Sequence, residues 1–372
     1  MKWEKVDFGE LYLLPSKNGL NRPSNVRGSG YRMINMGELF ANDRIKDIPM
    51  ELVLLNDREL ESSNILENDL LFARQSIVLS GAGKCSIVLE VPEITTFESH
   101  LIRIRLNQKR ASPLFYYYYF RTPLANMTSL VQQGVQSGIR GSELKFLRVI
   151  YPPLHTQHRI ASILSAYDDL IENNLKRIKL LEEKARIEYK SIQKNEKLEI
   201  EKAVEVLQFT TGKLNSNAAI QNGLYPFFTC GQEILRTNTF SVDEEVVLLG
   251  GNNASAIYPV FYYKGKFDAY QRTYIIKPKP AFYISFKYLY FFWEGKLDYL
   301  KNISTGAATK FLTLKILNDI DVPLPSKKVM EEYEILTEPI FELKAILAEQ
   351  NTKLREARDI LLPKLMNGQI EV

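Results

Sequence analysis

The amino-acid sequence predicts a mixed α/β (α+β) fold in which two globular domains alternate with two long helices. Apolar residues recur every seven positions along two stretches of the chain, which is the spacing of a helix packed on another long helix. Short runs rich in β-branched and aromatic residues, typical of strands, precede each stretch. Because this order occurs twice, roughly 170 residues apart, we expect an internal duplication of a globular module followed by a helix.

The chain is long enough for two domains, with 372 residues. Its 48 Lys and Arg residues nearly balance 44 Asp and Glu residues, so nucleic-acid binding would have to come from local basic patches. Two isolated cysteines, Cys85 and Cys230, favour a reducing compartment over a disulfide scaffold, and we expect a cytoplasmic protein. The sequence has neither a signal-peptide pattern nor an apolar run long enough for a membrane span, so no membrane partner is expected.

The first globular module is expected at residues 1–151. The run FYYYYF follows Ser112 and Pro113, a good N-cap and first-turn pair, and therefore predicts a helix over 114–120. Consecutive aromatic residues on a helix mostly build a core, and stacking on bases is the alternative. The strand candidates of this module lie at 69–80, 84–91 and 100–106.

The first long helix is expected at residues 152–205. Pro152 and Pro153 disfavour helix in the residues before them, and no Pro or Gly follows until Gly212. Two heptad rows three residues apart form an a/d seam, so this helix should pack along a second one. The rows are Leu164, Ile171, Ile178, Ala185 and Ile192, and Tyr167, Asn174 and Leu181.

The second globular module and the second long helix are expected at 206–325 and 326–372. An aromatic helix is predicted over 288–293, and Pro339 predicts a kink or a late start of the long helix. The strand candidates lie at 245–250, 256–263 and 271–277. The heptad rows of the long helix are Leu336, Leu343, Gln350 and Ala357, and Ile340, Leu347, Leu354 and Leu361. The polar residues on the two seams either fix the register of the helices or are simply solvated.

Motifs for catalysis fail on inspection. The loop GAGKCS has Cys85 where a phosphate-binding loop needs Ser or Thr, and Val78 where it needs Gly, so a hairpin turn is expected. His155 and His158 have a metal-ligand spacing but no third ligand near them in sequence, which favours a solvated helix start. We therefore predict no catalytic residue, no metal site and no cofactor on this chain.

Charge placement gives the positive signal. Residues 99–142 contain no Asp or Glu, and residues 260–301 carry eight Lys or Arg against three acidic residues. Such excesses suit phosphate contacts and base-edge readout, with an ordinary solvated surface as the alternative. Arg140 and Lys310 also fall at matching places in the sequence alignment of the two modules. The predicted DNA-binding residues are Arg74, Lys84, Arg103, Arg105, Arg140, Asn252, Asn253, Lys264, Arg272 and Lys310.

A family resemblance covers essentially the whole chain. The string YPPLHTQHRIASILSAYDDLIENNLKRIKLLEEKARIEY resembles the central region of the specificity subunits of type I restriction–modification systems. The ending LREARDILLPKLMNGQI resembles their distal region, and NDLLFARQS followed by GKCSIVLE is similar to a string in their first target recognition domain. The opening of the second module, LQFTTGKLNSNAAIQNGLYPFFTCG, departs from the family pattern.

The resemblance implies a pseudo-two-fold arrangement, with two target recognition domains held apart by two long antiparallel coiled-coil helices. Each domain would read half of a split double-stranded DNA target. The helices would dock two methyltransferase subunits, which carry S-adenosylmethionine, and restriction/translocase subunits would join them. The residues expected to form the coiled coil and to dock partners are Leu164, Ile171, Asn174, Ile178, Leu181, Leu343, Leu347, Gln350, Leu354 and Leu361.

Two alternatives from other classes remain open at this point. A stand-alone DNA-modifying enzyme would methylate or cleave DNA without partners. A coiled-coil adaptor would show no salt-dependent DNA binding. A specificity subunit should bind DNA weakly by itself and modify nothing.

Overall fold

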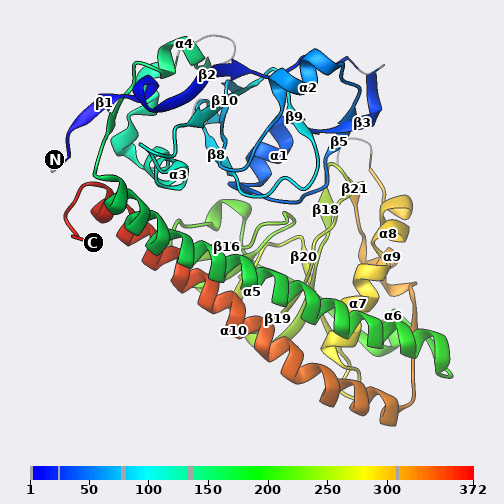
Figure 1. Cartoon of the computed structure of the whole chain (residues 1–372). Coiled ribbons are helices and arrows are strands. Elements are labelled where there is room, and N and C mark those ends of the chain that lie inside the picture. Colours follow the sequence, from blue (N-terminus) through cyan, green and yellow to red (C-terminus); the bar gives the residue numbers. More distant parts are fainter. Residues whose placement is uncertain (1–2, 24–25, 77–80, 132–136, 307–309) are drawn as a thin grey trace. The chain divides into compact units, whose positions relative to one another are not determined.

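The computed structural model describes residues 3–23, 26–76, 81–131, 137–306 and 310–372 (Figure 1). It forms two compact units: unit 1 comprises Met1–Asn173 with Gln350–Val372, and unit 2 comprises Asn174–Glu349. Both long helices are therefore divided between the units, whereas the sequence-based boundaries gave each helix a segment of its own. No helix in the described ranges is both long and apolar enough for a membrane span.

Unit 1 is built on a five-stranded sheet in the order β2-β10-β6-β8-β4. Neighbouring strands are antiparallel except β4, which is parallel to β8. The strands of this sheet are β2 (Tyr12–Asn18), β4 (Arg44–Ile45), β6 (Leu70–Ala73), β8 (Cys85–Val88) and β10 (Leu101–Leu106). A smaller sheet, β5-β3-β9, consists of β3 (Arg27–Ile34), β5 (Glu51–Val53) and β9 (Thr95–Phe97), accompanied by α1 (Met36–Ala41) and α2 (Asp57–Ser63).

Two short ladders and several short helices complete unit 1. The ladder of β1 (Lys5–Asp7) with β12 (Arg148–Ile150) joins the start of the unit to the segment before the long helix, and β7 (Gln75–Ser76) pairs with β11 (Ser137–Gly138). The predicted strand at 69–80 is thus β6 and β7, with residues 77–80 outside the described ranges. The remaining helices are η1 (Phe8–Leu11), α3 (Pro113–Phe120), η4 (Pro123–Ala125), η5 (Met127–Leu130) and α4 (Gly141–Leu144).

Unit 2 repeats this plan. Its sheet has the order β14-β20-β17-β19-β15-β16, and β15 is parallel to β19 just as β4 is parallel to β8. The strands are β14 (Leu207–Thr211), β15 (Tyr225–Phe228), β16 (Leu235–Thr237), β17 (Val242–Gly250), β19 (Val260–Ala269) and β20 (Thr273–Pro278). The matching strand order confirms the internal duplication predicted from the sequence.

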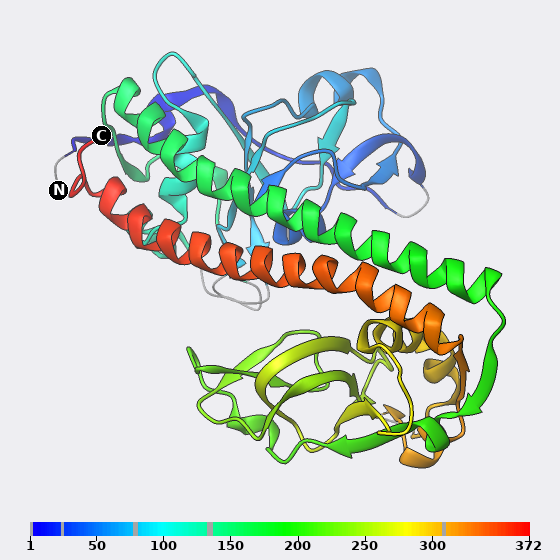
Figure 2. The same cartoon turned by 90° about the horizontal axis from the view of Figure 1, so that it is seen from below.

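The two short ladders of unit 2 also have counterparts in unit 1, and Figure 2 shows the chain from below. The pair β13–β22 corresponds to β1–β12, and the pair β18–β21 corresponds to β7–β11. These strands are β13 (Glu199–Lys202), β18 (Asn252–Asn253), β21 (Lys310–Phe311) and β22 (Asp321–Leu324). The helices are α6 (Ala203–Val206), η6 (Ser216–Ala218), α7 (Phe286–Gly295), α8 (Leu297–Ile303) and α9 (Leu314–Asn318).

The aromatic helices α3 and α7 form the centres of the two cores. Each begins at a serine N-cap, Ser112 or Ser285, whose hydroxyl accepts a hydrogen bond from the third residue of the helix. The aromatic side chains of α3 are buried in the core of unit 1, and those of α7 are buried in the core of unit 2. The prediction that these runs build cores is confirmed.

The long helices are α5 (Leu154–Asn195) and α10 (Lys327–Met366). α5 begins after the proline pair, where the Gln157 side chain donates to Pro152 O at 2.8 Å and accepts from Ser112 N at 2.8 Å. The sequence predicted a helix as far as residue 205. In the structure α5 ends at Asn195, and β13 and α6 follow it. α10 starts well before Pro339 and runs through it, so of the two predicted effects of Pro339 the late start is wrong and the kink stays a prediction. The carbonyl that loses its partner belongs to Ile335, on a solvent-exposed face where water can satisfy it.

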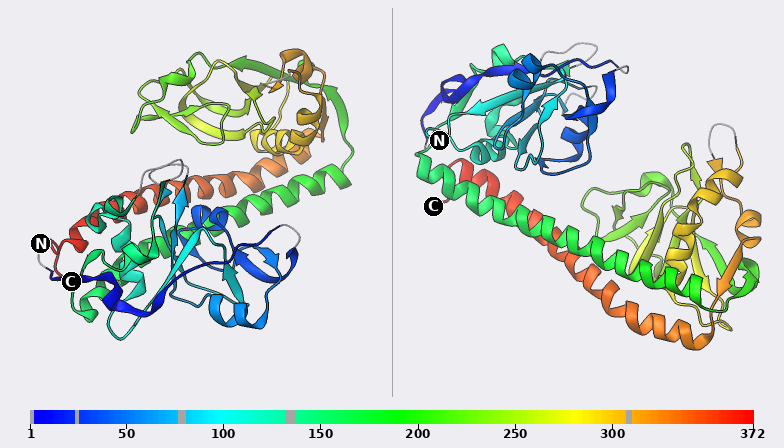
Figure 3. Two further views of the ribbon diagram at one scale, coloured as in Figure 1. Left: turned by 90° about the horizontal axis from the view of Figure 1, so that it is seen from above. Right: turned by 45° about the vertical axis from the view of Figure 1, so that its right-hand side comes forward.

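The two long helices lie side by side and antiparallel in each unit (Figure 3). In unit 1, Asn351 Nδ2 donates to Ile171 O at 3.4 Å. In unit 2, Tyr333 Oη donates to Ala185 O at 3.3 Å, and Lys344 pairs with Glu182. Both heptad rows predicted for α5 are buried or half-buried.

One predicted row of α10 is displaced by one residue. Ile340, Leu347, Leu354 and Leu361 do lie on the buried side, but Leu336 and Gln350 are exposed and Leu343 is half-buried. The second buried row is mostly polar, so the spacing of apolar residues does not reveal it. It consists of Met330, Thr337, Lys344, Asn351, Arg358 and Leu365. Asn351, 1% exposed, therefore takes the buried position that was predicted for Gln350 on the α10 seam.

A buried ion cluster fixes α7 to α10 in unit 2. The fully buried Lys287 ammonium lies 3.0 Å from Glu245 and also contacts Glu334 and Glu338. These carboxylates are close enough together to hold a metal ion, but the ammonium already provides a cation among them. Burial alone would lower the pKa of Lys287, and hydrogen bonds to the carboxylates raise it above its ordinary value, so the side chain stays charged.

Replacing Lys287 by Met should lower the free energy of unfolding of unit 2 by about 3–5 kcal/mol, because three partly buried carboxylates lose their common cation. Lys264→Met is the matched control, since Lys264 contacts Glu338 from an exposed position, and it should change stability by less than about 1 kcal/mol. Denaturant unfolding would be followed by the fluorescence of buried Trp293 in a Trp3→Phe background. Equal effects of the two substitutions would contradict the structural role of Lys287.

The same cluster predicts a pH dependence. The hydrogen bond from Lys287 lowers the pKa of Glu338 to about 2, against the opposing effect of burial. Because this pKa is lower in the folded state, the stabilisation is present above about pH 4.5 and is lost as the pH falls toward 2. The stability difference between wild type and Glu338→Gln should therefore be constant near neutrality and shrink as the pH falls from about 4.5 to about 2. A stability difference that does not change with pH would argue against this role of the Lys287–Glu338 pair. The substitution Glu342→Gln, at an exposed position of the same helix, serves as the control.

Candidate nucleic-acid interface

In unit 1, basic residues gather where the central strand β6 ends. Arg74 follows β6, and its carbonyl accepts from Ile139 N at 2.9 Å, which holds the Gly138 loop against it. A side chain at Gly138 would meet the Arg74 carbonyl at 3.1 Å, so the glycine permits this close approach. Arg140 comes next and is exposed, with Glu143 3.9 Å away as its ion-pair partner. We call this meeting of β6, β7 and β11 the unit 1 corner.

The unit 1 corner borders a groove of about 800 Å³ between β2 and α4. Three cationic side chains and no acidic residue line it: Arg74, Arg140 and Lys145. The wall on β2 includes Leu13, which is 57% exposed. An open groove with an excess of positive charge and some apolar surface suits a nucleic-acid backbone and the edges of its bases.

Unit 2 has the same construction where β17 ends. Gly251 N donates to Arg272 O, and Leu312 N donates to Gly251 O, both at 2.8 Å. β18 and β21 pair beside this point, with Asn252 opposite Phe311 and Asn253 opposite Lys310. Arg272 is exposed, and its guanidinium lies over the Phe311 ring at 5.2 Å. This unit 2 corner therefore brings four of the residues predicted to bind DNA into one place: Asn252, Asn253, Arg272 and Lys310.

The structure corrects the equivalence of Arg140 and Lys310. Ile139 N bonds to Arg74 O just as Leu312 N bonds to Gly251 O, which makes Ile139 the counterpart of Leu312. Arg140, at the N-cap of α4, thus corresponds to Thr313, at the N-cap of α9. The alignment of the two glycine loops from sequence was off by three residues, although both cations do lie at the corners.

The asparagines are more constrained than expected. Asn253 Oδ1 accepts from Ser255 N at 2.8 Å, and its amide donates to Cys230 O at 3.4 Å, so this side chain closes the turn. Asn252 Oδ1 is buried and has no hydrogen-bond partner among the described residues. Neither amide is presented to solvent as freely as Arg272.

Two of the arginines predicted to contact DNA are engaged inside unit 1. Arg103 is 5% exposed and donates to Asn64 O at 3.0 Å inside unit 1. Arg105 forms a bidentate pair with the fully buried Asp69, with both nitrogen–oxygen distances at 2.7 Å. These arginines compensate a buried carboxylate and a backbone carbonyl, as buried polar groups require. The sequence marked them as cations without showing that Asp69 would lie beside them.

Lys84 and Lys264 are also engaged by the protein. The Lys84 ammonium donates to Phe40 O at 2.8 Å and lies 3.0 Å from Asp43. Asp43 in turn accepts from Arg121 at 2.6 Å. Burial would raise the pKa of Asp43, but Arg121 and Lys84 together hold it below its ordinary value. Lys264 pairs with Glu338 on α10 at 3.2 Å.

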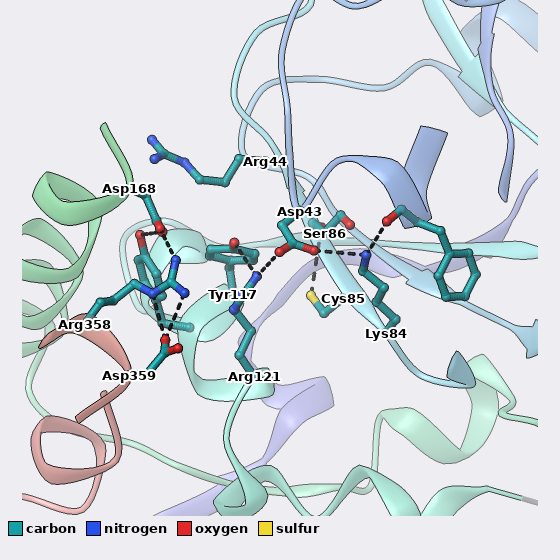
Figure 4. A network of polar contacts seen from close by, with 12 residues as sticks. Asp43, Arg44, Lys84, Cys85, Ser86, Tyr117, Arg121, Asp168, Arg358 and Asp359 are labelled. Carbon is teal, nitrogen blue, oxygen red and sulfur yellow. Dashed lines mark hydrogen bonds and ion pairs between the residues drawn. The ribbon is translucent and has the colours of Figure 1, made fainter. Parts of the chain in front are cut away.

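Figure 4 shows that the Asp43 cluster and the helix seam lie close together in unit 1. Arg121 donates to Tyr117 Oη at 2.8 Å, and the neighbouring Tyr118 Oη donates to Asp168 Oδ2 at 2.6 Å. Asp168, on α5, also pairs with Arg358 on α10. Polar groups thus connect the globular part of unit 1 to both long helices.

The sequence did not identify the residues that join the two long helices to each other and to the globular parts. The missed residues are Tyr118, Asp168, Lys287, Asn351 and Arg358, all placed by tertiary contacts far apart in sequence. One signal was available, because Asp168 is a charged residue one heptad after Ala161 and one heptad before Leu175, both apolar. Cys85 and Cys230 are both free thiols. His155 and His158 are exposed at the start of α5.

Comparison with known proteins identifies the class. The model of the type I restriction modification DNA specificity domain matches residues 2–183 and again residues 195–352. The chain therefore belongs to this family and carries two copies of its domain, which confirms the resemblance seen in the sequence.

Individual relatives agree with this assignment. The EcoDI specificity subunit of Escherichia coli is 34% identical over 170 residues, which cover 45% of this chain and 37% of that protein. The putative MjaX specificity subunit of Methanocaldococcus jannaschii is 24% identical over 410 residues, covering 100% of this chain and 94% of that one. The crystal structure of the type I S subunit from M. genitalium matches 98% of this chain and 96% of that chain with a TM-score of 0.63 at 18% identity, which supports the fold.

The structure predicts that exposed cations at the two corners contribute to DNA binding and that Lys264, which lies outside the corners and pairs with Glu338, does not. Replacing Arg140 or Lys310 by Ala should reduce the slope of log binding constant against log salt by about one unit each, because each removes a phosphate contact. Lys264→Ala is the matched control and should leave the slope unchanged. DNA affinity of the complex that contains this chain would be measured across a salt series. Unchanged slopes for both corner variants would remove the corners from the DNA interface.

Proposed function

We propose that this chain is the DNA-recognition subunit of a type I restriction–modification complex, in which each unit reads one half of a split target on double-stranded DNA. The observation that carries the proposal is the duplicated corner, where one backbone frame presents exposed cations in each unit. A repeated module provides two recognition domains with the same fold, as a DNA target in two parts requires.

The long helices supply a surface for protein partners. Their seam residues are used in pairing with each other, so the outward apolar residues are the better candidates for docking. These outward residues are Leu170, Leu175, Leu180, Ile187, Ile335, Ile346 and Ile360, each more than 45% exposed. Exposed Leu and Ile at this density on helices mark a protein-interaction surface. We assign this surface to two methyltransferase subunits, and restriction/translocase subunits would complete the complex.

Chemistry resides on the partners in this proposal. S-adenosylmethionine would be bound by the methyltransferase subunits, and this chain would carry out no catalytic step. Its own residues position the DNA: corner cations contact phosphates, and exposed side chains beside them contact base edges. We place the complex in the cytoplasm, with the chromosomal DNA that it modifies.

The proposal is tested by methylome sequencing in a host that carries the methyltransferase subunits with or without this chain. A bipartite motif should be methylated only when the chain is present. Methylation by the purified chain alone would favour the stand-alone enzyme. An unchanged methylome, together with no salt-dependent DNA binding of the assembled complex, would favour the adaptor.

A further inference from the structure

We infer that Arg272 reads a guanine in the half-site recognised by unit 2. This inference rests on the proposed function and adds to it the base and the residue that contacts it. Arg272 is exposed at the unit 2 corner, with its guanidinium over the Phe311 ring at 5.2 Å. Among the described residues, no acidic side chain forms an ion pair with it.

The N–H groups of the Arg272 guanidinium are available to a ligand. In the part of the chain that the structure describes, the cation–π contact with Phe311 is the contact of this side chain, and none of its N–H groups donates a hydrogen bond to the protein. The planar fork of N–H groups matches the O6 and N7 acceptors of guanine in the major groove, which is the commonest specific contact in protein–DNA complexes. Stacking also limits the rotamers of a long side chain, which reduces the entropy lost when the base is bound.

The backbone beneath Arg272 is fixed on two sides. Its carbonyl accepts from Gly251 N at 2.8 Å and from Cys230 Sγ at 3.3 Å. A Cβ at Gly251 would lie 2.5 Å from that carbonyl, so only glycine allows the contact. Phe311 is held equally well, because it exchanges backbone hydrogen bonds with Thr305 at 2.7 and 3.1 Å. The backbones of Arg272 and Phe311 are therefore both fixed by hydrogen bonds, as precise recognition requires.

The equivalent place in unit 1 has different chemistry. His100 precedes β10 just as Arg272 precedes β20, since His100 O accepts from Arg74 N where Arg272 O accepts from Gly251 N. Gly138 lies opposite Gln75 where Phe311 lies opposite Asn252. Unit 1 thus has neither the guanidinium nor the ring at this point. The two units therefore have the same backbone arrangement at this point but different side chains. Two domains that recognise different half-sites need such a difference.

Neighbouring Lys310 provides a contrast within the same corner. In an antiparallel ladder, residues opposite each other share a face and successive residues alternate, so Phe311 and Lys310 point to opposite faces of β21. Lys310 presents a point charge without a stack, which suits a phosphate and carries no base information. Arg272 and Lys310 should therefore respond differently to substitution.

The test uses the assembled complex with its methyltransferase subunits and a pool of DNA with randomised sequence at fixed salt. Bound DNA is sequenced for wild type, Arg272→Lys, Arg272→Ala and Lys310→Ala. Wild type should enrich a bipartite motif with a G·C pair in one half-site. Arg272→Lys should lose discrimination at that pair by roughly tenfold to a hundredfold, because lysine keeps the charge without the bidentate fork. The other half-site should stay enriched in this variant, which shows that the complex is folded.

Lys310→Ala should lower binding to all sequences evenly and keep the motif. Phe311→Leu removes the stack and should weaken preference at the same G·C pair as Arg272→Lys. Three results would overturn the inference alone: full preference retained in Arg272→Lys, an even loss over all sequences in Arg272→Ala, or a change confined to A·T pairs. A wild-type complex without any sequence preference would overturn the proposed function, and the inference with it.

Discussion

The antiparallel seam between α5 and α10 is the constraint on which the rest of the structure depends. Neither helix has an apolar stripe broad enough to make the helix stable by itself. Each unit includes a segment of both helices in its hydrophobic core. Polar groups set the register: Asp168 contacts Arg358 in unit 1, and Glu182 contacts Lys344 in unit 2. A buried charge without its partner is costly, so a shift of one helix along the other is disfavoured at both places.

The aromatic helices transmit this register to the globular parts. Tyr118 of α3 donates to the same Asp168 that Arg358 contacts, and Tyr290 of α7 donates to the same Glu182 that Lys344 contacts. One tyrosine hydroxyl thus bonds to a seam carboxylate in each unit. The corners lie on the strands that these helices cover, so their position in each unit follows from the seam through a chain of buried contacts.

Much of this architecture could be predicted from the sequence, because it depends on local patterns. The proline pair before the first long helix, the serine cap of the first aromatic helix and both heptad rows of α5 can be recognised in the sequence. The polar row of α10 was missed because a seam that pairs charges has no apolar signature. The internal partners of Arg103 and Arg105 were not visible in the sequence for a similar reason, since Asn64 and Asp69 come close to β10 through strand pairing and not through sequence proximity. The cations at the corners could be recognised in the sequence. Which residue of one glycine loop corresponds to which residue of the other depends on backbone hydrogen bonds, and these cannot be inferred from residue types.

The division of the chain has a consequence for its biosynthesis. Unit 2 is a continuous segment, whereas unit 1 combines residues 1–173 with residues 350–372. The late segment supplies Leu362, Leu365 and Met366 to the core that contains α3. A ribosome therefore delivers every residue of unit 2 before it delivers the last piece of unit 1. The half that emerges first is completed last, and until then the nascent chain exposes the apolar surface that the end of α10 will cover.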